Sequence, residues 1–83
     1  MRDRDMDTTA QARPLADIET AREVRLVSID AGRGLMSRLA SMGFLPGTAF
    51  IVKANRGFGP VIVALKGTRV MIGRGMAQKM LVE

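Results

Sequence analysis

The 83-residue chain contains no cysteine and no histidine. Without cysteine there can be no disulfide, thiolate metal site or cysteine nucleophile, and without histidine the commonest transition-metal ligand is missing as well. Tyrosine and tryptophan are also absent, so three phenylalanines are the whole aromatic content. We therefore expect no cofactor, no defined metal site and no catalytic nucleophile or base of the usual kinds.

Long hydrophobic runs are missing too. The longest, Val61–Leu65, is far too short to cross a bilayer, so we expect a protein that is not itself embedded in a membrane. Residues 1–13 alternate charges and carry no apolar segment, which predicts a flexible N-terminal tail and no secretory signal. Together these features favour a cytoplasmic protein with one domain over residues 14–83.

Acidic residues are scarce where an active site would need them. Four of the five carboxylates after the tail come before the expected helix, and we interpret them as solvated side chains; they are Asp17, Glu19, Glu23, Asp30 and Glu83. Three Gly-x-Gly pieces occur, but none continues into a dinucleotide fingerprint or a phosphate-binding loop. The sequence therefore predicts a protein that is not an enzyme.

Hydrophobic periodicity predicts a mainly β fold. Between residues 33 and 42 the apolar positions follow helical spacing, whereas the other apolar runs are short, β-branched and bounded by glycine or proline. The expected strands are Val24–Ile29, Thr48–Ala54, Val61–Leu65, Thr68–Ile72 and Met80–Val82, and "GRGMAQ" is expected to form one helical turn. Five short strands with one inserted helix describe a small, partly closed antiparallel barrel.

The stretch "RLASMGFLPG", residues 38–47, combines a helix end with a turn. Gly43 occupies the position of a left-handed C-cap, and Pro46-Gly47 fits the centre of a type II turn. Neither device requires the large apolar side chains of Phe44 and Leu45. These either lie at the surface, where they would serve as contact residues, or fold under and seal one end of the barrel.

The charge is unevenly distributed. Residues 1–30 carry five basic and seven acidic side chains, whereas residues 31–83 carry eight basic residues and one acidic residue. Such a surface attracts anionic partners of several kinds without choosing between them. One alternative is a small RNA-binding module that uses Arg33, Lys53, Arg56, Lys66, Arg69, Arg74 and Lys79. With so few aromatic side chains available for stacking, no nucleic-acid partner is expected.

Two segments, "GRGLMSRLASMGFLPGTAFIV" and "GPVIVALKGTRVMIGRGMAQKMLV", resemble the FeoA family of bacterial ferrous iron transport, and the resemblance runs from about Pro14 to Val82. Its most specific parts are Arg38-Leu39, Met42-Gly43, Pro46-Gly47, Gly59-Pro60, Gly67, Ile72-Gly73-Arg74, Ala77 and Val82. The resemblance implies an SH3-like barrel with a helix after the first strand. It also implies a cytosolic accessory protein of the FeoB permease, with no enzyme activity; transition metal binding enters only as a family-level association.

We expect the partner to be bound at the end of the helix. Exposed apolar residues beside an arginine have the composition of interface hot spots, and the expected contact residues are Arg38, Met42, Phe44, Leu45 and Pro46. Further basic contacts are expected from Arg33, Arg56, Arg69 and Arg74. In a sharper version of this hypothesis, Arg38, Arg56 or Arg74 reaches the GTP site of the permease. Self-association through the same apolar patch stays open.

Overall fold

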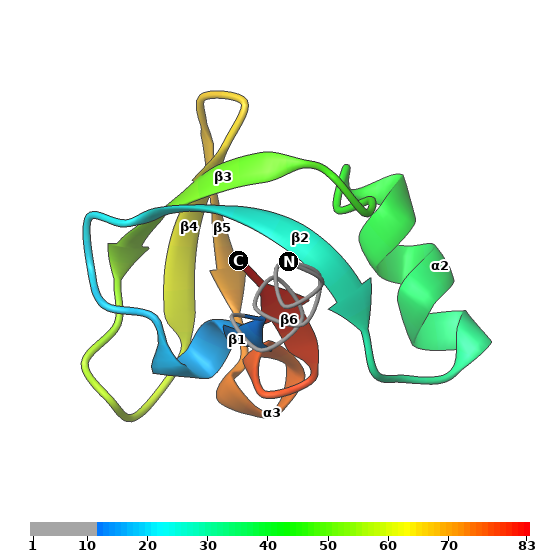
Figure 1. The fold of residues 1–83 in the computed structure, drawn as a ribbon, viewed down its shortest axis with the longest axis horizontal. Coiled ribbons are helices and arrows are strands. Elements are labelled where there is room, and N and C mark those ends of the chain that lie inside the picture. The colour runs from blue at the N-terminus through cyan, green and yellow to red at the C-terminus, as the bar shows by residue number, and fades with distance from the viewer. Residues whose placement is uncertain (1–11) are drawn as a thin grey trace, which may run out of the picture.

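The computed structural model describes residues 12–83 (Figure 1). The chain forms β1 (Arg13–Pro14), a 3-10 turn η1 (Leu15–Asp17), β2 (Glu23–Ile29), α2 (Arg33–Ser41), β3 (Ala49–Ala54), β4 (Val61–Leu65), β5 (Thr68–Ile72), α3 (Arg74–Ala77) and β6 (Met80–Val82). The expected mainly β fold with one short inserted helix is confirmed. The five predicted strands, β2 to β6, begin and end within one residue of their predicted positions.

The six strands form one antiparallel sheet in the order β1-β6-β2-β3-β4-β5. Among the described residues β1 and β5 have one neighbour each, so the sheet is open and the word barrel describes it only loosely. The hairpin between β4 and β5 turns through Lys66 and Gly67, both with positive φ, as expected for a two-residue loop. Within residues 12–83, β1 and β5 are thus the two edge strands of the sheet.

The first described strand, β1, begins at Arg13. Arg13 pairs with Val82 across β1 and β6, and its guanidinium donates a 2.8 Å hydrogen bond to the Asp17 carbonyl. The rest of the expected flexible tail, up to residue 11, lies outside the described residues.

Alternation along the strands builds the core. Phe50 and Val52 of β3 and Val61, Val63 and Leu65 of β4 point inward and are buried, whereas the residues between them face outward. The buried side chains are all apolar, and no buried polar or charged residue occurs within residues 12–83. The core is therefore held by apolar burial without any buried charge.

Helix α2 lies at one end of the molecule, on the right in Figure 1, and connects β2 to β3. Gly43 follows the helix with φ +104°, and Gly47 has φ +93° in a turn closed by a 2.9 Å hydrogen bond from the Thr48 amide to the Leu45 carbonyl. The predicted C-cap and turn are both confirmed. Leu39 is the one fully buried residue of α2, and the partly buried Leu35 also packs against the core, so two side chains anchor the helix.

Candidate interaction surface

Helix α2 and the turn after it expose apolar side chains on two sides. One groove runs between α2, the end of β2 and the turn, and it is lined by Ser28, Ile29, Met36, Ser37, Ala40, Phe44, Leu45 and Pro46. A second groove lies between α2 and the region where β5 meets α3, and it is lined by Leu35, Arg38, Leu39, Met42, Met71, Ile72, Gly73 and Met76. We call α2 with both grooves the α2 surface.

Most of the predicted contact residues lie on this surface. Leu45 is 51% exposed and Met42 is 48% exposed, one in each groove. Pro46 lines the first groove beside Leu45, and the exposed Arg38 lines the second. Met36, 43% exposed, joins the first groove although the sequence did not single it out as a contact. Only one short helix separates the two grooves, so these exposed side chains lie on both sides of α2, with the cation Arg38 in the second groove.

Phe44 does not lie at the surface. Its side chain is 1% exposed, and its ring packs edge-to-face on Phe50 with the centroids 5.3 Å apart. The Phe44 amide donates to the Leu39 carbonyl at 2.9 Å, which turns the chain back under the helix and directs the ring into the core. Of the two alternatives for this residue, the structure therefore adopts the sealed one, and Phe44 lies buried beneath the first groove, so its role in partner binding stays a prediction.

The four arginines expected as basic contacts do not gather at one place. Arg33 is on α2, Arg56 follows β3 and Arg69 is on β5, and all three are exposed. Arg74 differs, because its half-buried guanidinium donates to the Gly59 carbonyl at 2.8 Å, to the Ala16 carbonyl at 3.2 Å and to Asn55 Oδ1 at 2.6 Å. Its donors are used within the fold, so the structure gives Arg74 a role in holding segments together, and its role as a contact residue stays a prediction.

Asn55 is the residue that sequence reasoning missed. Its Nδ2 donates to the carbonyls of Ala16 and Ile18 at 2.9 and 2.8 Å, and its Oδ1 also accepts from the Gly57 amide at 3.1 Å. In the sequence, an asparagine before Arg-Gly suggests only a local turn. The contacts to a segment nearly forty residues earlier carry no local signal.

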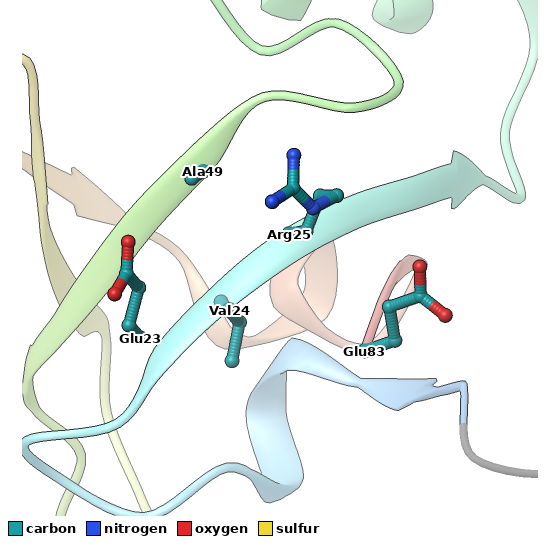
Figure 2. A pocket seen from close by; sticks show the side chains of 5 residues that line it. All are labelled: Glu23, Val24, Arg25, Ala49 and Glu83. Atoms are coloured by element: carbon teal, nitrogen blue, oxygen red, sulfur yellow. The ribbon is translucent and has the colours of Figure 1, made fainter.

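Two carboxylates of the described residues line one polar hollow. Figure 2 shows a polar hollow lined by Glu23, Val24, Arg25, Ala49 and Glu83, in which the two glutamates lie apart from each other. Arg25 donates to the Gly47 carbonyl at 3.0 Å, so it supports the turn after α2. Within residues 12–83, no three Asp, Glu, His or Cys side chains converge as metal ligands would.

Glu19 is the carboxylate with a shifted pKa. A hydrogen bond from its backbone and the guanidinium of Arg22, 3.0 Å away, hold the pKa of Glu19 below its ordinary value. The pair is exposed to solvent and therefore adds little to stability. We interpret it as a local surface ion pair.

The described residues contain no helix with the length and apolarity needed to span a membrane. The open antiparallel sheet and the helix inserted after β2 define a small SH3-like β domain. The FeoA domain model matches residues 13–83. By this match over nearly the whole chain, the protein belongs to the FeoA domain family.

Relatives and solved structures agree with this assignment. A protein of Methanocaldococcus jannaschii named "Putative Fe(2+) transport protein A" is 47% identical over 70 residues, and the match covers 84% of each chain. The crystal structure of an iron uptake regulatory protein, FeoA, superposes with a TM-score of 0.79 at 29% identity, covering 88% of this chain and 96% of that one. A manganese-dependent transcriptional repressor with manganese bound superposes with a TM-score of 0.78 at 29% identity, but the match covers only 36% of the repressor.

Proposed function

We propose that the protein is an accessory component of ferrous iron uptake, that it catalyses no reaction itself, and that it binds the cytoplasmic side of an FeoB-type GTPase permease and modulates transport. Membership of the FeoA family, together with a relative named for Fe(2+) transport, supports the link to iron. The absence of cysteine and histidine supports a role through binding rather than catalysis.

The observation that carries the proposal is the α2 surface. Met36, Met42 and Leu45 are each about half exposed although they are large and apolar, and they flank one short helix. Exposure of such side chains to water is unfavourable, and the free energy falls when a partner covers them. Methionine also adapts to the shape of the partner. Arg38 at the edge supplies a cation that can pair with an acidic rim.

A pull-down with the cytoplasmic domain of the permease tests this proposal. Replacing Leu45 by Ser (Leu45→Ser) removes an exposed apolar side chain from the first groove and should weaken retention about tenfold, the size of a moderate hot spot. Phe58→Ser is the matched control, because Phe58 is 66% exposed and is not part of the α2 surface. This control should be retained like the unmodified protein.

Two results would count against the proposal. If both variants bind like the unmodified protein, the α2 surface is not the contact. If the permease domain is not retained at all, while the protein binds RNA tightly with a steep salt dependence, the alternative of an RNA-binding module is the better one.

A further inference from the structure

The outer face of the sheet, on the side away from the core, carries a second apolar surface. The registers of β3, β4 and β5 place Ala54, Ile62 and Met71 in one row across the strands, with Ile51 and Ala64 in the next row. The inward neighbours of these residues, such as Val63 and Ile72, are buried, so the row residues face outward. Three neighbouring strands therefore turn apolar side chains away from the core.

Phe58 extends this face beyond the sheet. It lies in the loop between β3 and β4 and lines a hollow together with Ala54, Ile62 and Arg56. Phe58 is 66% exposed and Met71 is 68% exposed, the two highest values among the large apolar side chains of residues 12–83. We call this surface the sheet-face patch, and it consists of Ile51, Ala54, Phe58, Ile62, Ala64 and Met71.

The sheet-face patch is bordered by cations. Lys53 lies at the irregularity near the end of β3, Arg56 lines the hollow with Phe58, and Arg69 stands across from Ala64 on β5; all three are exposed. Glu23 on β2 lies opposite Ile51 and is a carboxylate at the border. Glu19 precedes the segment that lies beside β3 and is paired with Arg22. The ion pair found within residues 12–83 joins Arg22 to Glu19, so none of the three border cations is neutralised there.

The distribution of charge indicates which kind of partner the sheet-face patch binds. A second copy would set one cationic border against another, offset in part by Glu23, and like charges at a contact are unfavourable. Phe58 and Met71 are the two most exposed large apolar side chains of residues 12–83, and side chains that insert among lipid headgroups must be exposed in this way. Exposed apolar side chains bordered by lysine and arginine suit the boundary between the headgroups and the acyl chains of an anionic membrane.

We propose that the sheet-face patch docks the protein on anionic phospholipid. Phe58 and Met71 enter the interface, while Lys53, Arg56 and Arg69 contact the phosphate groups of the lipids. The patch meets the α2 surface at Met71, which also lines the second groove, but its other residues lie outside both grooves. In Figure 1 the β3–β4 loop, which carries Phe58, lies at the lower left and α2 at the far right. Membrane docking therefore does not rest on the proposed contact with the permease.

Flotation of the purified protein with lipid vesicles tests the proposal without any permease. We expect binding to phosphatidylcholine vesicles that contain phosphatidylglycerol and none to pure phosphatidylcholine. Removing two cations with the double variant R56A/R69A should lower partitioning about 25-fold, about fivefold for each charge. Phe58→Ser should lower it about tenfold, and because its side chain is exposed, circular dichroism should show an unchanged melting temperature.

Matched controls separate docking from bulk attraction. R33A/R38A removes the same charge from α2 and should lower partitioning by less than about threefold. Met71→Gln should weaken binding, whereas Met36→Gln, in the first groove of the α2 surface and away from Met71, should not. Equal losses from the two arginine pairs, binding that is indifferent to Phe58 and Met71, or affinity for acidic peptides without any for vesicles would each overturn the proposal.

Discussion

The side chains of Asn55 and Arg74 hold together three segments that are far apart in the chain. Asn55 reaches the carbonyls on both sides of Asp17, and Arg74 bridges Ala16, Asn55 and the Gly59 carbonyl. Hydrogen bonds from a charged donor are stronger than neutral ones, and those from Arg74 to Ala16 and Asn55 are partly buried. In a chain of this size, which buries a limited core, such contacts carry a large share of the stability.

Arg74→Ala should therefore destabilise the fold by about 2–3 kcal/mol, because it leaves the Gly59 carbonyl without its guanidinium donor and removes two further bonds. Arg74→Lys should recover only part of this, since an ammonium cannot reproduce the planar fork. Urea unfolding followed by circular dichroism measures both changes. Arg38→Ala, an exposed arginine, is the control and should stay within about 0.5 kcal/mol; equal losses for Arg38 and Arg74 would refute the structural role.

Single residues were predictable from the sequence when their role is local. Gly43 and Gly47 have the positive φ expected from their positions after a helix and a proline. The burial of Phe44 could not be decided, because it depends on Phe50 lying beneath the turn once the sheet has formed. For the same reason Arg74 was interpreted as a surface cation, since its acceptors come from elsewhere in the chain.

At the scale of elements, α2 is a weakly built helix. It begins at Gly32 without a side-chain cap, contains Gly34, has no acidic residue in its first turn and fully buries only Leu39. A helix with so few local supports depends on its two anchors and on whatever covers its grooves. This suits a contact element, because elements that bind partners are often drawn from the less stable parts of a fold.

Two glycines of this helical region should respond in opposite directions to alanine. Gly34→Ala should stabilise the protein by about 0.5–1 kcal/mol, since nothing lies within 4 Å of an added Cβ and alanine is the better helix former. Gly43→Ala should destabilise it by about 1–2 kcal/mol, because φ is +104° and the new Cβ would lie 3.1 Å from Leu65 Cδ2. The midpoint of urea unfolding reports both, and a shift of the same sign for the two variants would show that backbone conformation is not the controlling factor.

The elements that could be predicted are those with a pattern of their own. Strands β4 and β5 begin and end where expected, because alternating apolar residues and a two-residue turn define them locally. Strand β1 was missed because Arg13 and Pro14 have no strand pattern and become a strand only by pairing with β6. The openness of the sheet was equally hidden, since it depends on which strands meet.

At the scale of the whole molecule, the two proposed contact surfaces meet at Met71 and extend from there to opposite ends. The longest dimension of the domain is 38 Å, and in Figure 1 this axis separates α2 from the loop between β3 and β4. Each surface combines exposed apolar side chains with arginine, and the eight basic residues after position 30 supply the attraction. One small domain could therefore touch a protein and a membrane at the same time.

Simultaneous contact makes a prediction that neither surface makes alone. In a flotation experiment, the cytoplasmic domain of the permease should move to phosphatidylglycerol-containing vesicles only when this protein is present. Phe58→Ser should lower that recruitment about tenfold while leaving the pull-down intact. Leu45→Ser should lower it by a similar factor while leaving the protein itself on the vesicles, because each variant alters one end of the molecule. If either variant lost both retention in the pull-down and binding to vesicles, the two surfaces would act as one interface. The domain would then contact the permease and the membrane one after the other rather than together.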